Sequence, residues 1–156
     1  NLSHCGSHAM DTMRMESGFL HWGHDISPEE NQYEAGLSFA ISYKKESNFI
    51  GKESLVKFKK LKQDRRLIML SLIDSVPGWP LLLHEEPIYL KDTIIGRTTS
   101  GNYSFNYNKN LSFGYVKSEY SNEELGKRGL YIEVAKQKYP VKVEVDPLKD
   151  KQAKFL

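Results

Sequence analysis

Leu67-Ile-Met-Leu-Ser-Leu-Ile73 is the first of six short runs rich in Ile, Leu, Val, Tyr and Thr, and these runs decide the fold. Side chains of these types favour β-strands. Because six short strands have edges that need closure or cover, we expect a small antiparallel barrel or a sandwich, and we favour the barrel. The other five expected strands lie at 87–90, 93–99, 111–117, 130–135 and 141–145.

Turn-forming residues separate the expected strands. Such residues occur at Pro77-Gly78, Lys91-Asp92, Asn108-Lys-Asn110 and Gln137-Lys138. Strands and turns together predict an all-β module over residues 63–156. The preceding part has mixed patterns, so the sequence predicts an α+β chain with two domains, 1–62 and 63–156.

The segment before the barrel contains two further expected elements. Apolar side chains at every second position from Leu37 to Tyr43 predict a half-buried strand. Between residues 52 and 62, Leu55, Phe58 and Leu61 recur at helical spacing among lysines. This pattern predicts an amphipathic helix with those three side chains facing inward.

An earlier helix is expected over Met10-Asp-Thr-Met-Arg-Met-Glu-Ser-Gly18, ending at the glycine. Helical spacing places Ala9, Met13 and Leu20 on the same face as Glu16. A carboxylate on an otherwise apolar stripe is costly to bury unless a partner donates hydrogen bonds to it. Glu16 is therefore either a solvated helix residue or a buried carboxylate with such a partner.

Length and composition limit the classes of protein that fit. The chain of 156 residues is 39% hydrophobic and 27% charged, which is typical of a globular protein that buries a core and not of a disordered one. A net charge of +2 argues against a dedicated nucleic-acid binder. No apolar run has the length of a membrane span, and no segment is ordered like a secretory signal. We expect a soluble protein with neither nucleic acid nor membrane as a partner.

Two clusters of polar side chains are candidates for a site. His4, Cys5 and His8 lie close enough in sequence to suggest metal ligands, but ordinary surface side chains are the better interpretation, so no metal site is predicted. The loop His21-Trp-Gly-His-Asp25 combines aromatic and polar groups. Such a loop either lines a cleft that holds a ring-shaped ligand by stacking and hydrogen bonds, or packs on its own domain.

Several motifs in order resemble the folate-binding aminomethyltransferase family of the glycine cleavage T-protein. They span nearly the whole chain and are Arg14-Met-Glu16, His21-Trp-Gly-His-Asp-Ile26, Tyr33-Glu-Ala-Gly-Leu37, Phe49-Ile-Gly-Lys-Glu-Ser-Leu55, Glu86-Pro-Ile88, Gly96-Arg-Thr-Thr-Ser-Gly101 and Leu111-Ser-Phe-Gly-Tyr-Val116. The resemblance implies a C-terminal piece of the family's fold, with a partial folate domain followed by a small antiparallel β-barrel.

Within that family, Cys5-Gly-Ser-His-Ala9 and Trp22-Gly-His-Asp25 are most similar to sarcosine and dimethylglycine dehydrogenases. In those flavoproteins a flavin domain oxidises an N-methyl amine, and a folate domain captures the released one-carbon unit. The resemblance implies tetrahydrofolate as cofactor, with FAD only in an N-terminal region that this chain lacks. The implied partners are folate, a small methylated amine and the N-terminal remainder of the same polypeptide.

Two alternatives stay open within the same resemblance. One is an interaction protein like the regulatory subunit of pyruvate dehydrogenase phosphatase, and the other is a glycine cleavage T-protein aminomethyltransferase. The implied compartment is the cytoplasm in a bacterium and the mitochondrial matrix in a eukaryote.

The resemblance also implies roles for individual residues. The family's glutamate that holds the pterin ring falls on Glu16, whose two oxygens match two adjacent N–H donors of the pterin. Trp22 lies in the loop expected to contact the ligand. Lys45 falls near the family's arginine for the folate tail, and it either pairs with a tail carboxylate or is solvated like Lys44. The family's catalytic aspartate lies upstream, so no catalytic residue is predicted here and this chain alone is expected to be inactive.

Overall fold

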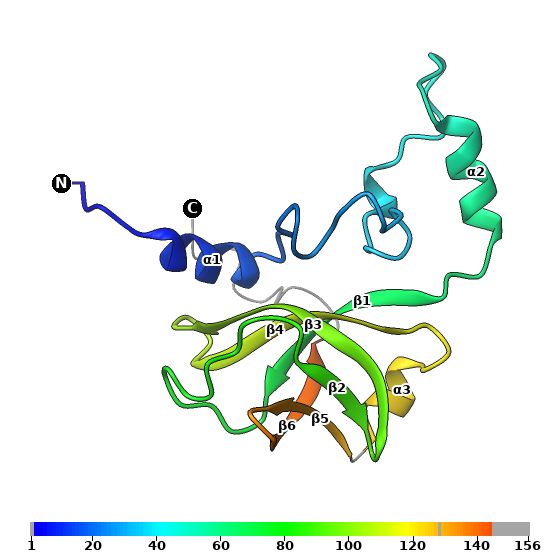
Figure 1. Cartoon of the computed structure of the whole chain (residues 1–156). Coiled ribbons are helices and arrows are strands. Elements are labelled where there is room, and N and C mark those ends of the chain that lie inside the picture. Colours follow the sequence, from blue (N-terminus) through cyan, green and yellow to red (C-terminus); the bar gives the residue numbers. More distant parts are fainter. Residues whose placement is uncertain (1, 128, 145–156) are drawn as a thin grey trace.

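Six antiparallel strands close into one barrel in the order β1-β4-β3-β2-β5-β6 (Figure 1). The computed structural model describes residues 2–127 and 129–144. The predicted α+β chain with a small barrel is confirmed. Within the expected module 63–156, residues 128 and 145–156 lie outside the described residues, and they include position 145 of the last expected strand. The strands are β1 (Arg65–Leu72), β2 (Pro87–Leu90), β3 (Thr93–Ser104), β4 (Lys109–Lys117), β5 (Leu130–Val134) and β6 (Gln137–Glu144).

Tight hairpin turns join neighbouring strands. Lys91 has a positive φ in the two-residue turn between β2 and β3. Ala135 and Lys136 both have positive φ and form the two-residue turn between β5 and β6, as hairpins of this kind require. The prediction of a turn at Gln137-Lys138 was therefore wrong by two residues, because Gln137 already pairs with Val134.

The barrel has an apolar interior and a second apolar cluster on its outer surface. Alternate residues of each strand point inward, so the interior is filled mainly by Ile, Leu and Val. Met15, from the helix before the barrel, belongs to the outer cluster with Met69, Leu111 and Phe113. This outer cluster attaches the N-terminal helix to β1 and β4.

In the described residues, four short helices lie outside the barrel. Figure 1 shows α1 lying across β3 and β4, whereas α2 stands clear of the barrel. No helix in the described part of the chain combines the length and the apolar character needed to cross a membrane. The helices are α1 (Ser7–Glu16), η1 (Ser38–Ala40, a 3-10 helix), α2 (Lys52–Lys60) and α3 (Asn122–Leu125).

The strand expected from Leu37 to Tyr43 is wrong, because this segment contains η1 instead. A strand needs a neighbour to pair its backbone N–H and C=O groups. The six strands of the barrel pair only with one another in a closed ring, so they offer no edge to a further strand. Alternation alone was therefore not enough to form a strand here.

Both expected helices form, with α1 beginning at Ser7 and α2 ending at Lys60, but their faces differ from the prediction. In α1, Ala9 and Met13 are exposed, whereas Met15 and Glu16 are buried against the barrel. In α2 no side chain is buried, and its apolar face is open: Phe58 and the following Leu61 are exposed. The spacing was right for a helix, but the described residues supply no surface that covers this face of α2.

A charged cluster joins β6 back to β1. The carboxylate of Glu144 accepts hydrogen bonds from Ser71 Oγ at 2.6 Å and from Lys142 Nζ at 2.9 Å, and Lys109 Nζ lies 3.6 Å away. Burial raises the pKa of Glu144, but the hydrogen bonds from Ser71 and Lys142 outweigh burial and hold the pKa below its usual value. Glu144 therefore stabilises the closed barrel in its ionised form.

Replacing Glu144 with glutamine is expected to cost about 1 to 2 kcal/mol of unfolding free energy at pH 7. Because the folded-state pKa is depressed, this contribution is present above the unfolded pKa of about 4.3 and is lost as the pH falls through the folded-state value. Urea denaturation at pH 7 and pH 3 should show the difference from the wild type shrinking at pH 3. Glu119→Gln, at an exposed position, is the control. An equal difference at both pH values would contradict the role of the charge.

Candidate functional site

Glu16, at the end of α1, is a buried carboxylate with three donors from the barrel. Its side chain is 3% exposed. Ser104 Oγ donates to Oε1 at 2.5 Å, and Asn106 donates through its backbone N–H to Oε1 at 3.3 Å and through Nδ2 to Oε2 at 2.6 Å. The partner that a buried carboxylate requires is therefore present within the chain.

This arrangement limits what else Glu16 can bind. A carboxylate offers about four lone-pair positions, and the barrel uses three of them. A pterin ring that donates two N–H groups to Glu16 would have to displace the Asn106 side chain. The contact between Glu16 and a pterin stays a prediction, with Asn106 as the group that must move.

Asp25 is a second buried carboxylate in the same region, and it is fully buried. Its Oδ2 accepts from Arg14 Nη1 at 2.7 Å and from the backbone N–H of His21 at 2.8 Å. Its Oδ1 accepts from Thr99 Oγ1 at 2.6 Å and from Ser100 Oγ at 2.7 Å. Asp25 thus joins α1, the loop after it and β3. The sequence named Asp25 only as a member of the polar and aromatic loop His21-Trp-Gly-His-Asp25, without a role of its own.

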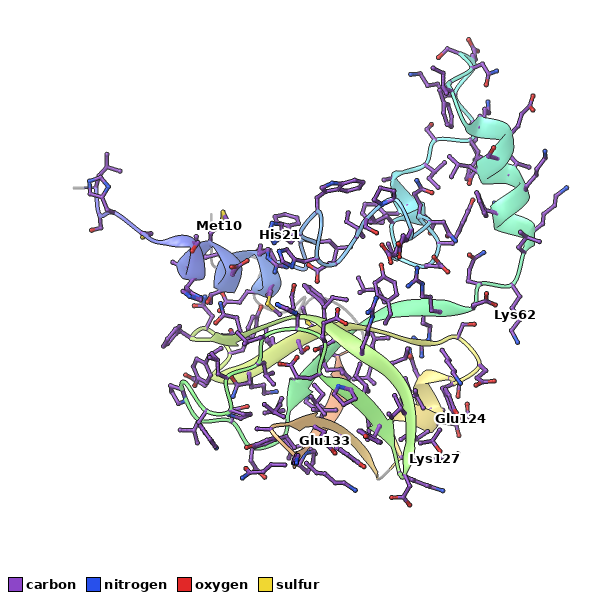
Figure 2. The ribbon with its side chains drawn as sticks, in the orientation of Figure 1. Met10, His21, Lys62, Glu124, Lys127 and Glu133 are labelled. Carbon is purple, nitrogen blue, oxygen red and sulfur yellow. The ribbon has the colours of Figure 1, made fainter. Side chains whose placement is uncertain are left out.

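The structure agrees in part with each of the two interpretations that the sequence left open for the loop around Trp22. Asp25 packs on the barrel, whereas Trp22 is 65% exposed. In Figure 2, His21 lies next to the end of α1, above β3 and β4. The ring centroids of His21 and His24 lie 4.6 Å apart, and the ring centroid of His84, in the loop between β1 and β2, lies 6.0 Å from that of His24. The loop therefore presents an exposed aromatic surface on a buried anchor.

Lys45 lies in a different part of the structure from Glu16. Its side chain is exposed, and its backbone C=O accepts from Lys52 Nζ at 3.4 Å. It borders a cavity of about 420 Å³ whose other walls include Leu37, Ile41 and Phe49. Glu16 and Trp22 do not line this cavity, so the three residues named from the sequence are not brought together in one pocket.

A cavity of about 640 Å³ lies between the segment after α1 and the outer surface of the barrel. Its size is within the range of small-ligand sites, and its walls are mostly apolar. Gly18, Phe19 and Leu20 form one wall, and Met69 and Phe113 contribute to the other.

Arg66 brings a cationic side chain into this cavity, and sequence reasoning missed it. Its Nη2 donates to the C=O of Tyr120 at 3.0 Å, and burial lowers its pKa. A guanidinium carries five N–H donors in a planar fork, which suits a carboxylate. The only signal in the sequence was the Arg65-Arg66 pair that begins β1.

Tyr115 completes the buried polar groups beneath the loop. Its hydroxyl donates to the backbone C=O of Asp25 at 2.9 Å, and burial, followed by the nearby Glu30, raises its pKa. It therefore stays a neutral donor.

Among residues 2–127 and 129–144, no three His, Cys, Asp or Glu side chains are grouped so that they would hold a metal ion.

Comparison with known proteins gives the class of this chain. Residues 65–150 match the glycine cleavage T-protein C-terminal barrel domain, and residues 1–45 match the GCVT N-terminal domain. The chain belongs to the glycine cleavage T-protein family, as the resemblance predicted. This family binds tetrahydrofolate.

Individual relatives include both oxidising and transferring enzymes. The chain is 42% identical over 98 residues to the 4-methylaminobutanoate oxidase (formaldehyde-forming) of Paenarthrobacter nicotinovorans, covering 63% of this chain and 12% of that protein. It is 35% identical over 144 residues to the mitochondrial dimethylglycine dehydrogenase of Rattus norvegicus, covering 92% and 16%. It is also 35% identical over 142 residues to an aminomethyltransferase of Listeria monocytogenes, covering 91% and 37%.

The fold is also found in a solved structure. The crystal structure of glycine cleavage system aminomethyltransferase T from Bartonella henselae matches with a TM-score of 0.74 at 20% identity, covering 89% of this chain and 37% of that one. The chain therefore spans between 12% and 37% of the length of these relatives.

Proposed function

We propose that this chain forms the C-terminal, tetrahydrofolate-binding part of a longer N-demethylating flavoprotein of the sarcosine or dimethylglycine dehydrogenase type. The observation that carries the proposal is the 35% identity to rat dimethylglycine dehydrogenase over 92% of this chain, which amounts to only 16% of that protein. The identity to a formaldehyde-forming methylaminobutanoate oxidase supports the same substrate class, a methylated amine.

In this proposal the chain binds and orients folate, and the redox chemistry belongs to the region upstream. FAD held there would supply the two-electron oxidation of the N-methyl amine, and this chain would hold the tetrahydrofolate that receives the one-carbon unit. Residues 1–62 complete a folate domain with that upstream region, and the barrel of residues 63–156 packs against it. Glu16 receives the pterin N–H groups once Asn106 moves aside, and Trp22 offers its exposed ring for stacking.

The apolar surface before the barrel supports a larger parent protein. The side chains of Phe39, Ile50, Phe58 and Leu61 are all exposed, although apolar side chains of this size are normally covered. We propose that the N-terminal remainder of the same polypeptide covers them. The catalytic aspartate of the family would also be supplied by that remainder.

A glycine cleavage aminomethyltransferase is the second candidate, because the Listeria relative is equally similar at 35% identity over 91% of this chain. The two candidates differ in the length of the whole protein. This chain covers 37% of the aminomethyltransferase but 16% of the dehydrogenase, so a flavoprotein parent would be more than twice as long. The absorption spectrum of bound flavin in the purified full-length protein would separate them.

Tetrahydrofolate titration of the full-length protein by isothermal calorimetry tests the proposal. We expect the wild type to bind and Glu16→Gln to bind about tenfold or more weakly, because the variant loses a charge-assisted contact. Glu119→Gln, at an exposed position, should bind like the wild type. A wild type that does not bind tetrahydrofolate would refute the proposed function, whereas equal affinity in a folded Glu16→Gln variant would remove only Glu16 from the site.

A further inference from the structure

A β-bulge in β3 aims two neighbouring hydroxyl groups at one carboxylate. The pairing of β3 with β4 passes from Thr98 opposite Gly114 to Ser100 opposite Phe113, so Thr99 is the extra residue. In a regular strand, adjacent side chains point to opposite faces of the sheet. At this bulge, Thr99 and Ser100 both donate to Oδ1 of Asp25. The bulge therefore redirects a side chain, as bulges beside functional sites commonly do.

The other oxygen of Asp25 holds the loop to α1. Arg14 Nη1 and the backbone N–H of His21 both donate to Oδ2. Arg14 also donates through Nη2 to Ser100 Oγ at 2.9 Å, which closes a ring of hydrogen bonds between α1, the loop and β3. The carboxylate of Asp25 thus accepts from four donors in all. An asparagine at position 25 has only one acceptor oxygen, so its own amide N–H groups would face at least one of these donors.

Trp22 lies inside the turn that this network holds. The backbone N–H groups of His24 and Asp25 donate to the C=O of His21, and the N–H of Gly23 donates to the C=O of Ile26. Because Trp22 is mostly exposed, packing does little to fix its indole ring. The orientation of Trp22 therefore depends on the anchoring of the residues on either side, and Asp25 is the group that anchors them.

We propose that Asp25 is a positioning residue: held by the bulged Thr99-Ser100 pair and by Arg14, it fixes the loop so that Trp22 presents its ring to the bound folate. This inference rests on the proposed function. Asp25 does not touch the ligand, and it acts through Trp22.

A double-mutant cycle in the full-length protein tests the inference, with tetrahydrofolate affinity as the readout. Asp25→Asn and Trp22→Ala are each expected to raise Kd about tenfold, and the double variant is expected to bind no more weakly than the weaker single variant. Hydrogen exchange of residues 19–26 should rise in Asp25→Asn. Thr99→Val, which removes one donor, is the milder variant if Asp25→Asn does not fold.

Leu125→Ala is the matched control, because it removes apolar volume from the barrel interior. It should lower the melting temperature while leaving Kd unchanged, so a loss of affinity in this variant would overturn the inference by showing that general instability is enough. Additive effects of Asp25→Asn and Trp22→Ala, or an unchanged Kd in Asp25→Asn, would also overturn it. If the wild type fails to bind, the proposed function and this inference fail together.

Discussion

Replacing Gly96 with alanine is expected to prevent the barrel from forming. A Cβ atom at this position would lie 1.9 Å from the backbone O of Tyr115 and 2.9 Å from the Cα of Val116. Both atoms belong to the backbone of β4, where Gly96 pairs with Val116. Neither can move aside without separating β3 from β4. We expect a loss of more than about 4 kcal/mol in unfolding free energy, or no soluble protein.

Gly6→Ala is the matched control for this change. Gly6 precedes α1 with φ of −84°, and a Cβ atom there would meet nothing within 4 Å. Because Gly6 is the N-cap of α1, where glycine is preferred over alanine, we expect a loss of no more than about 1 kcal/mol in unfolding free energy. Soluble yield and urea denaturation measure both variants. A Gly96→Ala protein as stable as Gly6→Ala would mean that β3 and β4 do not pair as described.

The barrel was predictable because its strands carry their own signal. Runs of β-branched and aromatic residues marked all six strands, and the turn at Lys91-Asp92 was found from residue types alone. Closure followed from the need to protect strand edges. The strand ends were less predictable: β3 continues to Ser104, well beyond the expected end at residue 99, because polar residues there are still paired with β4.

The segment before the barrel was predicted less well, since its patterns depend on neighbours outside the local sequence. Alternation from Leu37 to Tyr43 predicted a strand, but no sheet edge is open to receive one. Helical spacing in α2 was correct, yet Phe58 and the Leu61 that follows α2 stay exposed among the described residues. Periodicity predicts the local conformation, but it does not say which surface covers an apolar face.

The candidate site was predictable only in part. Family resemblance drew attention to Glu16, and the structure shows it buried, but its donors Ser104 and Asn106 lie some ninety residues away in the sequence. The network around Asp25 depends on a bulge at Thr99, and the residue types around a bulge do not reveal it. Long-range polar contacts of this kind have no periodic signature.

Replacing Arg14 with methionine is the second change with a large expected effect. Methionine keeps much of the aliphatic volume and a good helix propensity, so α1 itself is little affected. The substitution removes the cation that pairs with Asp25 at 2.7 Å, where the carboxylate has no solvent exposure and the Arg14 side chain has 14%. Removing one partner of a buried pair leaves a buried charge without compensation, which costs about 3 to 5 kcal/mol.

The exposed pair Arg97 and Glu85 provides the matched control, because its N–O distance is also 2.7 Å but both side chains are more than half exposed. Arg97→Met should cost no more than about 1 kcal/mol. Urea denaturation of the full-length protein measures both variants. Equal losses would show that burial does not set the strength of the Arg14–Asp25 pair. If burial does set it, adding Asp25→Asn to Arg14→Met should cost at least about 1 kcal/mol less than the two single losses added together, because the charge that Arg14 neutralised is then absent.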